Sequence, residues 1–356
     1  MDIEKDAHSL SYSLFGGDPH MITRRNARLV LLVLCLALTV MPTIRTISAT
    51  QAPSPMEVSP TADTAKVAPA GSIICCSTKS GETSLVDIAT GEVQVLPVSG
   101  SSIEISPDRK TLAYVDRREQ LHVYYLDTSR DVRISDPEDL EKYGSPTFVS
   151  NDTIAYIKRN RSYRTAIYTS RIDRLDERTW VGELPEGVST SSSTLKWIPG
   201  TAAEQASFVL GNVYGIYVLS PRGARALVSV DPKSGASLRY PAVSPDGAAI
   251  AYVHKSSASS IWTINVDGND ARQLTYSDGS WPTWSPNGQY IAFLTHAAGE
   301  RGLLQQDIYD PSRTERSAGS FLFGIGIMRR DGTPVQSVCG VDGKPVLAPG
   351  DYIAWR

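Results

Sequence analysis

The sequence predicts an all-β fold of the β-propeller class, and three repeated segments carry that prediction. Residues 244–252, Ser-Pro-Asp-Gly-Ala-Ala-Ile-Ala-Tyr, return 41 residues later at 285–293 as Ser-Pro-Asn-Gly-Gln-Tyr-Ile-Ala-Phe. A weaker copy, Ser-Pro-Asp-Arg-Lys-Thr-Leu-Ala-Tyr, occupies residues 106–114. A turn followed by a short apolar strand, recurring about every 40 residues, is typical of blades arranged around a central axis. The repeat predicts the fold and leaves the activity open.

Each unit shows the order of four strands. A first strand ends in Ser-Pro-Asp/Asn-Gly, where Pro sets φ, Asp or Asn bonds the local backbone and Gly takes positive φ. A second strand follows, such as 250–253, and then a third, such as 261–266, which Asp267-Gly268 closes as a hairpin signal. A fourth strand ends near Leu274-Thr275.

The number of blades follows from the third strand and its turn. This element occurs six times, at 85–91, 123–128, 167–173, 216–223, 261–268 and 325–332. We therefore expect six blades of four antiparallel strands. A seventh, degenerate blade is the competing interpretation, because residues 296–323 are irregular and could hide strands or form a long insertion.

The second-strand pattern occurs about seven times, once more than the third. The extra copy is Tyr352-Ile353-Ala354-Trp355, close to the last residue of the chain. A surplus strand at one end can pair with the first blade and close the ring, which leaves no sheet edge open. We expect residues 351–356 to perform this closure.

An export signal is predicted near the N-terminus. Residues 29–44 carry no charge and follow Arg24, Arg25 and Arg28. Sixteen residues are short for a membrane span, which needs about 20, and suit the apolar region of a signal peptide. The positive flank places the N-terminus in the cytoplasm and the rest of the chain outside. The signal could be cleaved after Ala52, or it could stay attached as a membrane anchor. Translation could also start at Met21.

Three segments follow from this organisation. Residues 1–45 form a cytoplasmic N-terminus with the signal peptide or signal anchor. Residues 46–71 are rich in Pro, Ser, Thr and Ala and are predicted to be an extended linker. Residues 72–356 form the propeller. We expect a secreted, periplasmic or membrane-anchored protein.

The net charge, the cysteines and the absence of known motifs limit the classes of partner and of reaction that we expect. The net charge is −3, which favours neither nucleic acid nor an acidic membrane surface. Cys75 and Cys76 are adjacent, so their side chains point to opposite faces of a strand; one of them could pair with Cys339, or all could be buried thiols. No metal-ligand spacing and no catalytic motif is present, so we expect no catalytic residue, metal or cofactor.

The repeats resemble those of TolB-type, or WD40-like, β-propellers. The resemblance rests on residues 282–293, Pro-Thr-Trp-Ser-Pro-Asn-Gly-Gln-Tyr-Ile-Ala-Phe, with Leu274-Thr275 upstream, and extends over residues 72–356. It implies an envelope module that binds a protein or peptide partner, although the domain that precedes the TolB propeller is replaced here by the linker. Some similar propellers are polysaccharide lyases, so an extracellular carbohydrate-active enzyme is the alternative.

Four residues are candidates for binding the partner. In propellers, the loops that enter the innermost strands gather around the mouth of the central channel. Here they carry Tyr143, Arg239, Tyr240 and Trp281, each close to a repeat proline. Aromatic and arginine side chains on loops are the types that anchor partners. The structural alternative is that Tyr240 and Trp281 pack between blades.

Overall fold

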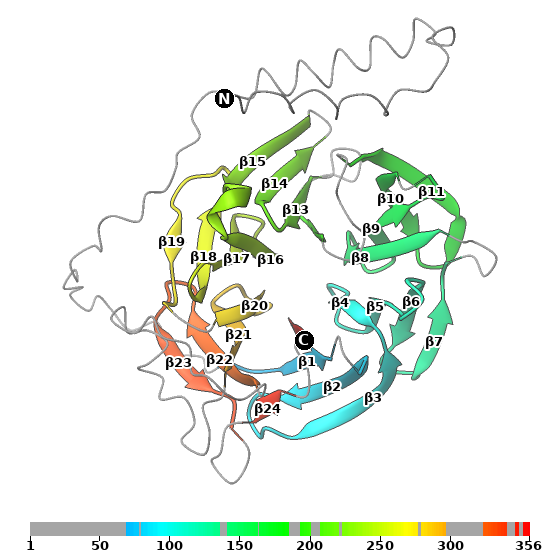
Figure 1. Ribbon diagram of the computed structural model, residues 1–356. Helices are drawn as coiled ribbons and strands as arrows, with labels where there is room; N and C mark the ends of the chain where they lie inside the picture. Colours follow the sequence, from blue (N-terminus) through cyan, green and yellow to red (C-terminus); the bar gives the residue numbers. More distant parts are fainter. Residues whose placement is uncertain are drawn as a thin grey trace, which may run out of the picture. The chain divides into compact units, whose positions relative to one another are not determined.

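The computed structural model describes residues 69–77, 80–135, 141–162, 164–184, 193–200, 207–220, 223–276, 279–296, 323–339, 346–348 and 352–356. These residues form a β-propeller, with six antiparallel sheets arranged around a central channel (Figure 1). Each sheet has four strands in one path, and the sixth has an added short strand. The prediction of six four-stranded blades is confirmed. No seventh sheet occurs in the described part of the chain, and the irregular segment suspected of hiding one lies almost wholly outside it.

The strands of each blade follow one another from the channel outward. In blade 1 they are β25 (Tyr352–Trp355), β1 (Ser72–Cys76), β2 (Glu82–Asp87) and β3 (Val93–Ser99). In blade 2 they are β4 (Ser101–Ile105), β5 (Thr111–Val115), β6 (Leu121–Tyr125) and β7 (Arg130–Arg133). In blade 3 they are β8 (Lys142–Phe148), β9 (Thr153–Arg159), β10 (Thr165–Arg171) and β11 (Arg174–Glu183).

The other three blades repeat this order. In blade 4 the strands are β12 (Thr194–Trp197), β13 (Phe208–Asn212), β14 (Gly215–Ser220) and β15 (Gly223–Ser229), followed by the short 3-10 turn η2 (Pro232–Ser234). In blade 5 they are β16 (Ser237–Val243), β17 (Ala249–Lys255), β18 (Ser259–Asn265) and β19 (Arg272–Gln273). In blade 6 they are β20 (Gly279–Trp284), β21 (Tyr290–His296), β22 (Phe323–Arg329) and β23 (Pro334–Ser337), with β24 (Leu347–Ala348) added beside β22.

In blades 2, 5 and 6 the turn after the innermost strand has the chemistry that the repeat predicts. In blade 5, Asp246 Oδ1 accepts the N–H of Ala248 at 3.0 Å, and Ser244 Oγ accepts the N–H of Ala249 at 2.9 Å. Gly247 has φ 69°. The repeated acidic or amide residue therefore acts as a turn former, as expected.

The predicted closure of the ring is confirmed. β25 pairs antiparallel with β1, with Trp355 opposite Ile73 and Ile353 opposite Cys75. Ile353 and Trp355 are 3% and 4% exposed. The sequence pattern groups residues 352–355 with the second strands, and that assignment is wrong, because β25 occupies the innermost position of blade 1.

The apolar cores lie between neighbouring blades. Cys75 belongs to the cluster that joins blades 6 and 1, with Leu294 and Ile325, whereas Cys76 belongs to the cluster that joins blades 1 and 2. The prediction that the two side chains point to opposite faces is confirmed. Both thiols are buried, neither is bonded to Cys339, and burial raises the pKa of Cys75.

The predicted export signal and nearly all of the predicted linker lie outside the described residues. Within the part of the chain that the structure describes, there is no helix with the length and apolar character needed to span a membrane.

Candidate functional site

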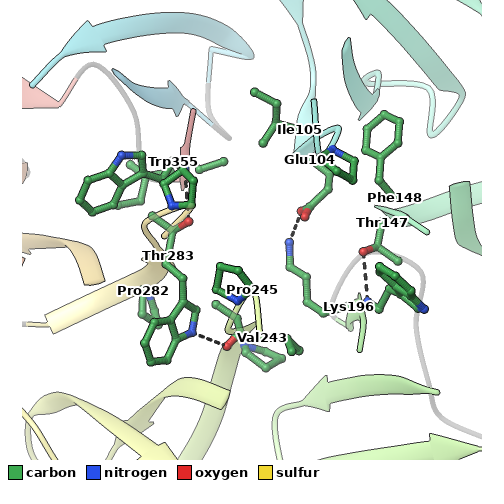
Figure 2. Close-up of a pocket in the computed structure, with 18 of the residues that line it drawn as sticks. Glu104, Ile105, Thr147, Phe148, Lys196, Val243, Pro245, Pro282, Thr283 and Trp355 are labelled. Carbon is green, nitrogen blue, oxygen red and sulfur yellow. Dashed lines mark hydrogen bonds and ion pairs between the residues drawn. The ribbon is translucent and has the colours of Figure 1, made fainter. Parts of the chain in front are cut away.

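A cavity of about 420 Å³ occupies the central channel (Figure 2). Residues from the innermost strands of all six blades and from the turns that follow them line it. Six of the lining residues are prolines: Pro107, Pro199, Pro241, Pro245, Pro282 and Pro286. Because proline fixes φ, these walls are rigid before any ligand arrives. A preformed cavity of this size is typical of sites that bind small molecules or short chain segments.

The innermost strands of blades 2, 3, 5 and 6 share an unusual backbone feature. Each has a register shift against its second strand near the point where the strand enters the channel. At that bulge one residue has positive φ: Ser102 at 51°, Ser145 at 46°, Tyr240 at 54° and Trp281 at 49°. A bulge re-aims a side chain, and a left-handed backbone costs an ordinary residue about 1–2 kcal/mol. Four blades therefore keep a strained conformation at the bulge of the innermost strand.

The two bulky residues of this set lie against each other. Tyr240 of blade 5 and Trp281 of blade 6 stack with ring centroids 3.4 Å apart and an interplanar angle of 22°. Both line the cavity, and Trp281 also packs against the two apolar clusters that flank blade 1. Strained residues that the surrounding structure holds in place are concentrated at functional sites. The aromatic pair, defined as Tyr240 and Trp281, is the most distinctive feature of the channel.

A charged pair lines the cavity. Lys196 of β12 in blade 4 reaches Glu104 of β4 in blade 2, and the two form an ion pair (Figure 2). Their side chains are 17% and 21% exposed. An ion pair that is shielded from water in this way interacts more strongly than a surface pair. Glu104 and Lys196 therefore neutralise each other inside the channel.

Other lining residues fasten the blades together. Thr147 Oγ1 accepts the backbone N–H of Trp197 in the next blade at 3.2 Å, and Thr283 Oγ1 accepts that of Trp355 at the same distance (Figure 2). Trp284 Nε1 donates to the carbonyl of Ala242 at 3.0 Å. These groups already have partners, so their contribution to the channel is structural.

The structure separates the four predicted site residues into two pairs. It brings Tyr240 and Trp281 together at the cavity. Tyr143 is 2% exposed and lies between blades 2 and 3, with its ring centroid 5.6 Å from that of Tyr156. Arg239 Nε donates to Ser237 Oγ at 3.3 Å, and neither Arg239 nor Tyr143 lines the cavity.

Sequence reasoning missed the charged residues of the cavity. Glu104 lies two residues before the turn serine, at the position that Ala242 and Thr283 occupy in blades 5 and 6. The signal that could have identified Glu104 is a charged side chain at a position that carries a small side chain in the other two repeats. Lys196 was obscured because its repeat, Trp197-Ile198-Pro199-Gly200, has lost the serine.

The charged groups that line the cavity are Glu104, Lys196 and Arg109, and no histidine is among the described lining residues. His122 lies elsewhere, on β6, with its ring nitrogens 3.6 Å from Asp116 and 3.4 Å from Asp131. Across the described residues, no three His, Cys, Asp or Glu side chains are placed to hold a metal ion. What the cavity offers is aromatic and proline surface with a small number of charges.

Comparisons with protein-family models and with curated proteins found no match. Among solved structures, the chain is similar to one from a nidogen/laminin complex, with a TM-score of 0.51, 9% identity and coverage of 80% of this chain and 97% of that one. It is also similar to a Bacteroides caccae protein of unknown function, with a TM-score of 0.52, 10% identity and coverage of 80% and 98%. An oligogalacturonate lyase from Vibrio parahaemolyticus has a TM-score of 0.46, 14% identity and coverage of 77% and 80%. The first two likenesses support the propeller fold and carry no function at these identities.

Proposed function

We propose that this chain is an exported, TolB-like β-propeller that binds a peptide segment of an envelope partner at its central channel. The observation that carries the proposal is the aromatic pair, two large side chains held at positive φ over a preformed cavity. Export is supported by the uncharged segment 29–44, which follows three arginines in the sequence. The TolB-like assignment is supported by the Ser-Pro-Asp/Asn-Gly repeat.

Binding fits the chemistry of the cavity better than catalysis does. Grooves lined by aromatic rings recognise proline-rich or apolar peptide segments, and rigid walls lower the entropic cost of binding them. Glu104 and Lys196 satisfy each other, so neither is poised as a free acid or base. In this proposal Tyr240 and Trp281 contact the partner, and Arg239 holds the strand that carries Tyr240. Tyr143 stabilises the interface between blades 2 and 3.

The test is selection of a synthetic heptapeptide library against the purified full-length chain in mild detergent. We expect a consensus sequence to emerge, and Trp281→Ala to weaken its binding by about thirtyfold, the loss expected for a central tryptophan. The matched control is Trp180→Ala, because Trp180 is 58% exposed on the outermost strand β11 and does not line the cavity.

Binding must be expressed per folded molecule, from the amplitude of the thermal transition. If Trp281→Ala and Trp180→Ala bind the selected peptide as the native chain does, the channel is not the site. If the purified chain instead degrades a polysaccharide and a chelator stops the reaction, the carbohydrate-active alternative is correct.

A further inference from the structure

The turn after the innermost strand of blade 2 differs from its counterparts in one residue. Arg109 occupies the position that Gly247 and Gly288 hold in blades 5 and 6. Its φ is 61°, against 69° and 67° for the two glycines. In all three turns the N–H of this residue donates to the carbonyl of the turn serine at 2.8 Å. Blade 2 therefore keeps the glycine conformation while carrying a large side chain that disfavours it.

The side chain of Arg109 has a specific place. It lines the channel cavity at the end where the turns lie, beside Pro107. Among the described residues, its guanidinium has no ion pair or hydrogen bond with a protein group. The strain is thus not offset by an internal contact of the arginine head group.

The charge of the cavity points in the same direction. Of its three charged lining residues, Glu104 and Lys196 neutralise each other, which leaves the single positive charge of Arg109. A ligand in this cavity meets aromatic and proline surface along the wall and an uncompensated guanidinium at the turn end. The complementary ligand has an apolar body and one negative group.

We propose that Arg109 is a recognition residue that binds a carboxylate of the peptide held in the channel. Guanidinium binds carboxylate through two parallel hydrogen bonds, which fix its orientation as well as its charge. Recognition of this kind gives a reason for an arginine at a position where glycine would relieve the backbone strain. The inference rests on the proposed function and adds to it that the ligand is an acidic peptide.

The test compares two small probes that differ only in the C-terminal group, the carboxylate N-acetylphenylalanine and its neutral amide N-acetylphenylalaninamide. Their affinities for the full-length chain are measured by ligand-observed NMR at low and high salt. We expect the acid to bind about tenfold more tightly than the amide at low salt, as for a hydrogen bond to a charged group, and salt to reduce this preference.

Three variants separate recognition from strain. Arg109→Gly should raise the melting temperature and abolish the preference for the acid. Arg109→Gln should abolish the preference with the melting temperature unchanged, because it keeps the strain and removes the charge. The control Ser129→Gly, at another exposed position with φ 52° outside the cavity lining, should raise the melting temperature and leave the preference intact.

Each outcome decides between the two proposals. Equal binding of acid and amide by the native chain, or an unchanged preference in Arg109→Gln, overturns the role of Arg109. If both probes still bind and Trp281→Ala releases both, the channel remains the binding site and only the acidic specificity fails. If neither probe binds, both proposals fail.

Discussion

Replacing Trp355 by alanine should remove the largest apolar group from the strand that closes the ring. Trp355 is 4% exposed and packs in the cluster between blades 6 and 1. Its indole N–H donates to the carbonyl of Ala70 at 3.1 Å. The substitution thus removes core packing and leaves a carbonyl without its donor.

The expected loss can be estimated from these contacts. Truncating a buried tryptophan costs about 3–5 kcal/mol, and the lost hydrogen bond adds about 1 kcal/mol. The sum, about 4–6 kcal/mol, is a large part of the 5–15 kcal/mol that stabilises a typical domain. For a propeller of this size, each kcal/mol corresponds to about 2–4 °C, so the melting temperature should fall by about 10–20 °C.

The assay is thermal unfolding followed by circular dichroism, with urea unfolding to give the free energy directly. The control is again Trp180→Ala, which should change the free energy of unfolding by less than about 0.5 kcal/mol because its side chain is exposed. A loss below about 1 kcal/mol for Trp355→Ala would refute the reasoning, because β25 would then not contribute to the stability of the ring.

Two further predictions concern pH and location. The Asp246 carboxylate accepts a hydrogen bond from Arg330 at 2.6 Å, and its contacts with Arg330 and the turn outweigh burial and lower its pKa to about 2. Because the unfolded chain binds this proton more readily, the stabilisation by Asp246 is complete above about pH 4 and is lost as the pH falls toward 2. Asp246→Asn should therefore reduce the change in the urea midpoint between pH 4 and pH 2. The same change in the variant as in the native chain would contradict the role given to Asp246. A reporter enzyme fused after Gly71 should be active only in an extracytoplasmic assay, and activity in the cytoplasm would exclude export.

The fold could be predicted from the sequence because its signals are local. The turn that begins at Ser244 is held by hydrogen bonds to residues at most five positions away, so it identifies the repeat without knowledge of distant contacts. The number of blades then follows from the six copies of the third strand. Closure by β25 could be predicted because a surplus strand at the end of the repeats can pair with the first blade and complete its sheet.

The site could be predicted only in part, because its geometry depends on register and on distant pairing. Tyr240 and Trp281 directly precede their prolines and lie at the bulge, whereas Tyr143 is three residues before Pro146 and falls in the interface between blades. Glu104 and Lys196 are 92 residues apart, and no periodicity announces their pairing. Nor does a proline reveal that the residue before it has positive φ.

The closing strand also sets the order in which the molecule can be completed. Trp355 and its acceptor Ala70 are 285 residues apart in the sequence, so blade 1 lacks its innermost strand until the last residues of the chain are available. Such long-range contacts form late and slowly, because the intervening chain must be ordered first. Blades 2 to 5, in contrast, are each built from consecutive strands. Blade 1 is therefore the last blade to be completed, and the pairing of β25 with β1 is the step that converts a row of sheets into a closed propeller.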